Sequence, residues 1–267
     1  MPDTDVWLFK LKTDKAKKSI LTESVNISNR PGYDNQPSFS LDGKKIYYVS
    51  VREDMQADIY IYEIGSKKTM PLAITKTSEY SPVITADGKY ITSVVVEEDS
   101  AQRVHFINAK TGVHAKKLEV DSVGYYNFLN EDTIVYYKLT EPHSLRYSNP
   151  KTIEDKWLGN RPIRAFKSIN RYTLLYGIKD TSSVTFYKYN FILHKAERYC
   201  DYPSLSEDAI WHQQLGLLKS EGAQLLRYNE IRSEWELLYD LSSFGIKKIT
   251  RFAFDSKNKQ LVVVNNL

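Results

Sequence analysis

The chain is poor in three features that would each indicate a particular class of protein. It has a single cysteine, Cys200, which excludes an internal disulfide and a zinc site built from cysteines. It has no run of about 18 apolar residues, so no transmembrane helix is expected. It also lacks the basic and apolar pattern of a signal peptide, and residues 2–5 lead directly into an expected strand. An abrupt start of this kind is compatible with a trimmed mature domain.

An excess of charge of one sign is also missing. The net charge is +4, from 37 basic and 33 acidic residues, and the basic residues are scattered along the chain. Nucleic-acid-binding domains instead gather basic side chains on one face or along one helix. We therefore expect no nucleic-acid partner.

Recognisable catalytic motifs are missing as well. There is no G-x-S-x-G elbow, and the nearest approach, residues 219–222, falls at an expected hairpin turn. There is no H-x-x-H or H-E-x-x-H, and the histidines are expected to fall in different structural units: His105, His114, His143, His194 and His212. The acidic run 97–99 matches residues 52–54, between the second and third strands of their repeats, which predicts a solvated loop. We expect no catalytic residue, no cofactor and no bound metal.

What the chain does have is tyrosine and an internal repeat. Its 20 Tyr residues favour strands. Residues 36–49 recur as residues 81–94 at a constant offset of 45, and the match continues from 59–62 onto 104–107. Each copy places an Asp-Gly turn between two apolar runs, which is a strong hairpin signal. With a third strand at 58–64 and a fourth at 71–75, the unit has the size of one propeller blade.

The repeat predicts an all-β, six-bladed β-propeller formed as a single domain over residues 1–267. We place its blades at 34–76, 79–120, 123–158, 162–200, 203–242, and 249–267 together with 5–24. The N-terminal strands should complete the last blade, because residues 6–9 match 59–62 and residues 21–22 match 74–75, both at an offset of 53. The eight extra residues are expected in the loop 25–33. Trp7, which matches Tyr60, is expected to be buried between blades.

The pattern Pro-Ser-Phe-Ser-x-Asp-Gly-Lys-x-Ile-x-Tyr at residues 37–48 resembles the repeats of TolB-like propellers, also called WD40-like or PD40 repeats. Residues 82–94 match it with Val83 in place of Phe. The resemblance implies a six-bladed propeller of a periplasmic or exported bacterial protein that acts through protein–protein contacts. The same family also supplies the propeller half of some serine peptidases.

In a propeller, the chain passes into the first strand of each blade at a face that opens on the central channel, where ligands usually bind. We call the residues at these positions the inlet residues: Asp34, Asn35, Gln36, Glu79, Tyr80, Tyr125, Tyr126, Arg161, Tyr202 and Lys248. They mix aromatic and polar groups, as interfaces do. We therefore expect a monomeric, non-catalytic binding scaffold with a protein partner.

Three alternatives remain open at this point. The chain could be the propeller domain of a peptidase. It could also be a metal-dependent lactonase or lyase, with Asp34 and Asn35 among the oxygen ligands that calcium prefers. Binding of a glycan by exposed tyrosines is the third.

Overall fold

The computed structural model describes residues 1–15, 19–53, 55–151 and 155–267. These residues form six four-stranded antiparallel sheets, which confirms the all-β, six-bladed propeller. The chain divides into two compact units. Unit 1 comprises Met1–Lys117 and Leu241–Leu267, and unit 2 comprises Leu118–Asp240. No helix among the described residues is long and apolar enough to cross a membrane.

Unit 1 contains three of the sheets and one short 3-10 helix, η1 (Ser242–Phe244). The terminal sheet has the order β2-β1-β24-β23, with β1 (Thr4–Thr13), β2 (Ser19–Asn26), β23 (Ile249–Phe254) and β24 (Gln260–Asn266). The first-repeat sheet is formed by β3 (Asp34–Phe39), β4 (Lys45–Val51), β5 (Ala57–Glu63) and β6 (Lys68–Pro71). The second-repeat sheet is formed by β7 (Ser78–Ile84), β8 (Tyr90–Val96), β9 (Gln102–Asn108) and β10 (His114–Lys117).

Unit 2 contains the other three sheets, each a meander of four consecutive strands. The first is formed by β11 (Val123–Asn130), β12 (Thr133–Lys138), β13 (Ser144–Ser148) and β14 (Lys156–Asn160). The second is formed by β15 (Pro162–Asn170), β16 (Thr173–Lys179), β17 (Val184–Asn190) and β18 (Lys195–Tyr202). The third is formed by β19 (Ala209–His212), β20 (Gly216–Glu221), β21 (Gln224–Asn229) and β22 (Glu234–Asp240).

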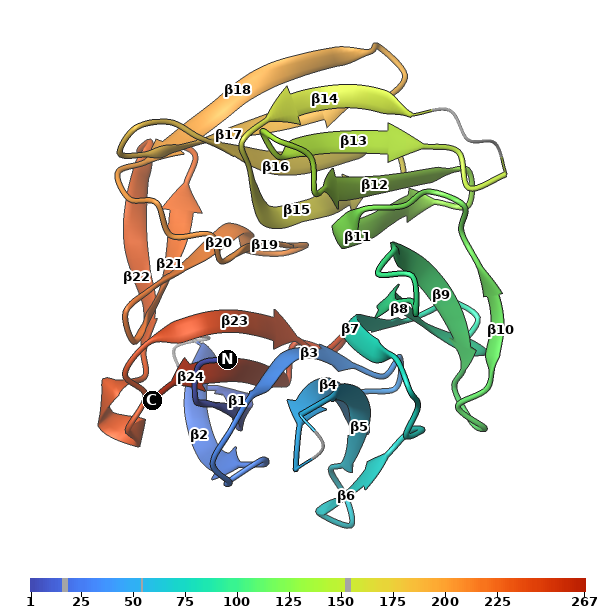
Figure 1. Ribbon diagram of the computed structural model, residues 1–267. Coiled ribbons are helices and arrows are strands. Elements are labelled where there is room, and N and C mark those ends of the chain that lie inside the picture. The colour runs from blue at the N-terminus through green and yellow to red at the C-terminus, as the bar shows by residue number, and fades with distance from the viewer. Residues whose placement is uncertain (16–18, 54, 152–154) are drawn as a thin grey trace. The chain divides into compact units, whose positions relative to one another are not determined.

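Both ends of the chain lie in the terminal sheet, as the sequence match predicted (Figure 1). Strand β1 pairs antiparallel with β24, so that Val6 lies opposite Val264 and Leu8 lies opposite Val262. Without β1, the backbone of β24 would be an exposed sheet edge. The match of residues 6–9 to the third strand of the repeat is therefore confirmed.

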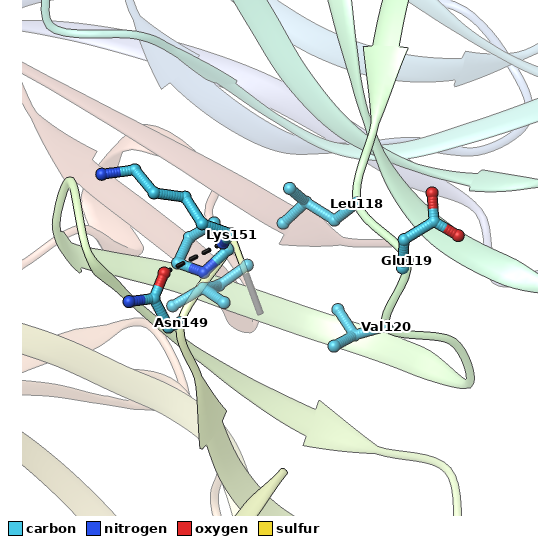
Figure 2. Close-up of a pocket in the computed structure, with 7 residues that line it drawn as sticks. Leu118, Glu119, Val120, Asn149 and Lys151 are labelled. Atoms are coloured by element: carbon cyan, nitrogen blue, oxygen red, sulfur yellow. Dashed lines mark hydrogen bonds between the residues drawn. The ribbon is translucent and has the colours of Figure 1, made fainter. Parts of the chain in front are cut away.

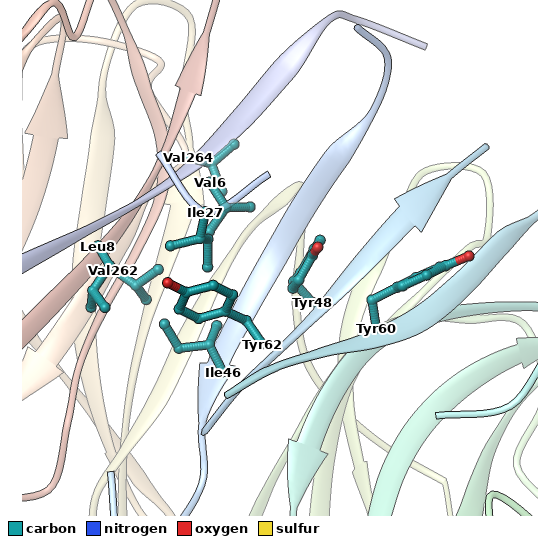
Figure 3. Close-up of a cluster of buried hydrophobic side chains, with 9 residues drawn as sticks. All are labelled: Val6, Leu8, Ile27, Ile46, Tyr48, Tyr60, Tyr62, Val262 and Val264. Carbon is teal, nitrogen blue, oxygen red and sulfur yellow. The ribbon is translucent and has the colours of Figure 1, made fainter. Parts of the chain in front are cut away.

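A buried apolar cluster joins the terminal sheet to the first-repeat sheet (Figure 3). Val6 and Leu8 project from β1 toward the ring of Tyr62 on β5. They share one face because side chains alternate along a strand. Ile46 completes this contact from β4, with its side chain fully buried.

Trp7 is half-buried, so the prediction that it would be buried between blades is wrong. It lies on the face of β1 opposite to Val6 and Leu8, because neighbouring side chains on a strand point to opposite faces. Its ring stacks near Phe9, with a centroid distance of 6.4 Å, and its buried indole nitrogen has no hydrogen-bond partner.

The eight extra residues of the N-terminal match lie in the β1–β2 hairpin, and the expected location in the loop 25–33 is wrong. Trp7 pairs with Asn26, whereas the equivalent Tyr60 pairs with Pro71, so the terminal hairpin is the longer one. From those partners to the next first strand the two segments have the same length. The insertion therefore extends β1 and β2 outward.

The fourth strand of the first repeat is β6 (Lys68–Pro71), so the expected strand at 71–75 is also wrong, and with it the match to residues 21–22. The chain reverses immediately after β5. Lys67 adopts a positive φ of 57° and its N–H bonds to the carbonyl of Glu63. This tight turn starts β6 earlier than the apolar pattern suggested.

Candidate functional site

The inlet residues divide by exposure. Five are buried, three are half-buried and two are exposed: Asp34, Asn35, Glu79, Tyr126 and Tyr202; Gln36, Tyr80 and Tyr125; and Arg161 and Lys248. Their role in binding stays a prediction. The acidic members are buried and the cationic members are exposed.

Asp34, at the start of β3, is fully buried and faces a cation supplied by the chain itself. The guanidinium of Arg30 donates to Asp34 Oδ2 at 2.9 Å and to the carbonyl of Val51 at 2.9 Å. Burial nevertheless raises the pKa of Asp34. Asn35 accepts from the N–H of Gln36 at 2.8 Å. The Arg30 guanidinium is thus the counter-charge of the buried Asp34 carboxylate.

Gln36 links two first strands within unit 1. Its Oε1 accepts a hydrogen bond of 2.6 Å from the N–H of Ser81, the equivalent residue of the second repeat. Both residues have a φ of 55°, at the irregularity in which the Pro-containing first strand departs from regular pairing. The repeated positive φ shows that this bend is a property of the repeat.

Glu79, at the start of β7, is only 2% exposed and has hydroxyl partners in place of a cation. Thr75 Oγ1 donates to Glu79 Oε1 at 2.5 Å, and Thr77 Oγ1 donates at 3.2 Å. Burial, together with the nearby carboxylate of Asp58, raises the pKa of Glu79 to about 7. In the 45-residue repeat Thr75 occupies the position of Arg30, so the two buried carboxylates differ in their counter-charge.

In unit 2, Tyr202 is the last residue of β18, so its expected place in the loop that enters the fifth blade is wrong. Its hydroxyl donates to Glu221 at 3.2 Å, and Lys219 Nζ lies 4.4 Å from its ring centroid. Lys219 is fully buried and donates to the carbonyl of Ser206 at 2.6 Å. Burial lowers the pKa of Lys219 to about 8. These contacts tie down the segment that leads into β19.

The exposed and half-buried inlet residues make fewer contacts of their own. In unit 2, Arg161 donates to the carbonyl of Lys179 at 2.9 Å, and Tyr125 packs edge-on against Tyr137. In unit 1, Lys248 is exposed immediately before β23, and Tyr80 is half-buried in β7. A cation and an aromatic ring are therefore accessible in each unit.

The prediction that the five histidines fall in different units is wrong for two of them. His105 in β9 and His114 in β10 belong to one sheet, and their Nδ1 atoms are 3.1 Å apart. Their separation of nine residues across a predicted hairpin is the sequence signal that could have revealed the pair.

Glu97 also differs from the expected solvated loop. Its side chain is 15% exposed and binds Arg103, His105 and Lys117. Burial alone would raise the pKa of Glu97, but these three donors outweigh it and lower the pKa to about 2. Glu98 and Asp99 are exposed as expected, and Asp54 of the equivalent run lies outside the described residues.

A small cavity in unit 2 lies beside the segment that leads to β11 (Figure 2). Its volume is about 50 Å³, and Leu118 and Val120 face Asn149 and Lys151 across it. The N–H of Lys151 donates to Asn149 Oδ1 at 2.9 Å. Pockets for substrates usually measure roughly 300–1,000 Å³, so this cavity is smaller than a substrate pocket.

The described residues provide neither a metal cluster of three or more ligands nor a reactive thiol. Within the described ranges, no group of three or more His, Cys, Asp or Glu residues is arranged to hold a metal ion. Burial raises the pKa of the Cys200 thiol to about 12, so the thiolate that reacts or binds metal is suppressed. Ser220 is fully buried in β20, and Gly222 forms the following turn with a φ of 55°, which confirms the predicted hairpin at 219–222.

No family model matches the chain, and no curated protein sequence matches it either. Solved structures share its fold. A putative TolB from Agrobacterium tumefaciens matches with a TM-score of 0.67 and 10% identity, over 100% of this chain and 99% of that one. An oligogalacturonate lyase in complex with manganese matches with a TM-score of 0.60 and 10% identity, over 94% of this chain and 82% of that one. A puromycin hydrolase matches with a TM-score of 0.54 and 7% identity, over 84% of this chain and 40% of that one. These likenesses establish the six-bladed propeller fold, which hosts binding proteins and enzymes alike.

Proposed function

We propose that the chain is a non-catalytic interaction scaffold of an exported bacterial protein, and that the exposed inlet residues of each unit bind acidic side chains of a protein partner. The observation that carries this proposal is the division of the inlet residues by charge. Asp34 and Glu79 are buried, whereas Arg161 and Lys248 are exposed. The accessible inlet positions are therefore cationic, although the chain as a whole carries a net charge of only +4.

Tyrosine rings in the same units as these cations support a protein partner. Tyr80 in unit 1 and Tyr125 in unit 2 are half-buried, so each side chain packs against its neighbours and remains partly accessible to solvent. Tyrosine and arginine are enriched among residues that dominate binding energy at protein interfaces. The fold likeness to a putative TolB is consistent with an interaction role.

Charge reversal tests the proposal with a matched control in each unit. Arg161 precedes β15 and Arg171 follows it, and both are exposed. Lys248 precedes β23 and Lys257 follows β23, again both exposed. The four variants are R161E, R171E, K248E and K257E, each tested as the immobilised full chain against a periplasmic extract.

We expect R161E and K248E to lose a captured partner that R171E and K257E retain. Raising the salt concentration should weaken capture by the unmodified chain, because exposed charges are screened. Equal capture by all four variants, or no specific capture by the unmodified chain, would refute the proposal. Cell fractionation checks the location, since an exported protein should be recovered outside the cytoplasm.

The peptidase-domain and metal-dependent lyase alternatives stay predictions. The likeness to an oligogalacturonate lyase in complex with manganese concerns the fold alone. Turnover of oligogalacturonate by the purified chain with Mn²⁺ would favour a lyase and displace the scaffold proposal.

A further inference from the structure

Two histidine rings meet in the second-repeat sheet of unit 1. His105 Nδ1 and His114 Nδ1 are 3.1 Å apart, and the ring planes are inclined at 73° with centroids 5.1 Å apart. The His105 side chain is 12% exposed and the His114 side chain is 29% exposed. The pair is therefore held by the sheet while solvent reaches one of its rings.

The outer nitrogen of each ring is directed toward a carboxylate. His105 Nε2 lies 2.7 Å from Glu97 Oε1, and Glu97 also accepts from Arg103 and Lys117. A carboxylate that binds two cationic side chains is an acceptor, so the proton of this contact belongs to His105 Nε2. His114 Nε2 is buried without a hydrogen-bond partner and lies 3.9 Å from the oxygen Oε1 of Glu79.

The two inner nitrogens share a hydrogen bond when one of them carries a proton, and they present two lone pairs to each other when neither does. A neutral imidazole that donates through Nε2 carries a lone pair on Nδ1. If His114 also donates outward, toward Glu79, two lone pairs face each other at 3.1 Å and repel unless a cation lies between them. A proton on the buried His114 Nε2 would then be directed toward the carboxylate of Glu79.

The spacing suits a transition metal. Zinc binds imidazole nitrogen at about 2.0–2.1 Å. With the two Nδ1 atoms 3.1 Å apart, one zinc ion bound to both would have an N–Zn–N angle of about 100°, which lies between the octahedral and tetrahedral values. Histidines that bind metals commonly donate their other N–H to a carboxylate, which fixes the tautomer and the ring orientation. Glu97 already makes such a contact with His105.

We propose that His105 and His114 chelate one divalent transition-metal ion through their Nδ1 atoms, with water completing its coordination and with Glu97 and Glu79 orienting the rings. Imidazole favours Zn²⁺, Cu²⁺ or Ni²⁺, whereas Mg²⁺ and Ca²⁺ prefer oxygen ligands. Two protein ligands and access to solvent describe an exchangeable site. The proposal does not depend on the proposed function, because the partner is proposed to bind the exposed Arg161 and Lys248 and neither histidine.

Calorimetric titration of the full chain tests the site. The protein should carry no histidine tag and should be treated with a chelator before ZnCl₂ or MgCl₂ is added. We expect one Zn²⁺ per chain and no Mg²⁺ binding. H105A and H114A should each abolish Zn²⁺ binding, and E97Q should weaken it about 10- to 100-fold, the usual cost of losing a partner that orients a ligand. The control is H194A, which removes an exposed histidine between β17 and β18.

Nitrogen-15 NMR of the unmodified chain gives a readout that does not rely on a variant folding. Zinc should shift the Nδ1 signals of two histidines only, while both Nε2 atoms stay protonated. Absence of Zn²⁺ binding at millimolar concentration would overturn the proposal, because the two rings would then share only a proton. Undiminished binding by both alanine variants, with melting curves like that of the unmodified chain, would overturn it as well.

Discussion

Replacing Glu79 by Gln should change how the stability of the protein depends on pH. The carboxyl is 2% exposed, and its pKa is raised from 4.5 to about 7 in the folded chain. Between these two values the folded state binds more protons than the unfolded state, so stability falls as the pH rises. Because one pKa unit corresponds to about 1.4 kcal/mol, Glu79 should reduce the free energy of unfolding by about 3 kcal/mol from pH 4.5 to pH 7.

The Glu79→Gln variant lacks this titration but keeps an oxygen that can accept from Thr75. The difference in unfolding free energy, variant minus unmodified chain, should therefore grow by about 3 kcal/mol from pH 4.5 to pH 7 and change little above pH 8. Urea titrations followed by circular dichroism, with a chelator present, measure this difference. Glu98→Gln removes an exposed carboxylate of the same blade and controls for the loss of one negative charge. A Glu79→Gln difference that stays constant across this range would refute the reasoning.

Three further predictions concern strands β1 and β20. Leu8→Ala should cost about 2–5 kcal/mol of stability. Trp7→Ala should cost less, because Leu8 is 4% exposed while Trp7 is half-buried. Equal losses of stability in urea titrations of the two variants would contradict the assigned faces of β1. Deleting residues 1–12 removes most of β1 and leaves β24 as an open edge, so we expect aggregation in light scattering, and a monomer with unchanged melting would argue against the pairing. Burial lowers the pKa of Lys219 to about 8, so between pH 8 and pH 10.5 the folded state holds fewer protons than the unfolded state and stability rises by about 3 kcal/mol. Lys219→Met should remove this rise. Parallel pH profiles of stability for the two proteins would show that Lys219 does not titrate in this window.

The sequence by itself determined the repeat and therefore the fold. Asp42-Gly43 and Asp87-Gly88 form the expected turns, with Gly φ values of 71° and 70° that glycine adopts without strain. The match of residues 6–9 to a third strand correctly joined β1 to β24. These features could be predicted because turn chemistry and strand periodicity are local, and a repeat shows each of them twice.

Strand lengths depended on details that the repeat conceals. The tight turn at Lys67, with its positive φ, makes β6 start earlier in the sequence than expected. The eight inserted residues lie in the longer β1–β2 hairpin. A difference in spacing between two matches gives the number of inserted residues, but the pairing register decides where they lie.

The chemical character of the side chains was decided only by the tertiary structure. Asp34 and Glu79 are equivalent in the repeat, yet Arg30 faces one and Thr75 faces the other. Their protonation follows from burial and from neighbours on other segments, which the repeat does not specify.

The histidine pair and the inlet residues were decided in the same way. In the ladder His114 lies opposite Ile107, which is two residues from His105 on the same face of β9, so the pairing register places the two histidines as diagonal neighbours. Exposure then separated Arg161 and Lys248 from the buried carboxylates of the same predicted set. A sequence pattern fixes which positions are equivalent, whereas packing against distant segments fixes what each side chain meets, because burial and contact are properties of the folded chain.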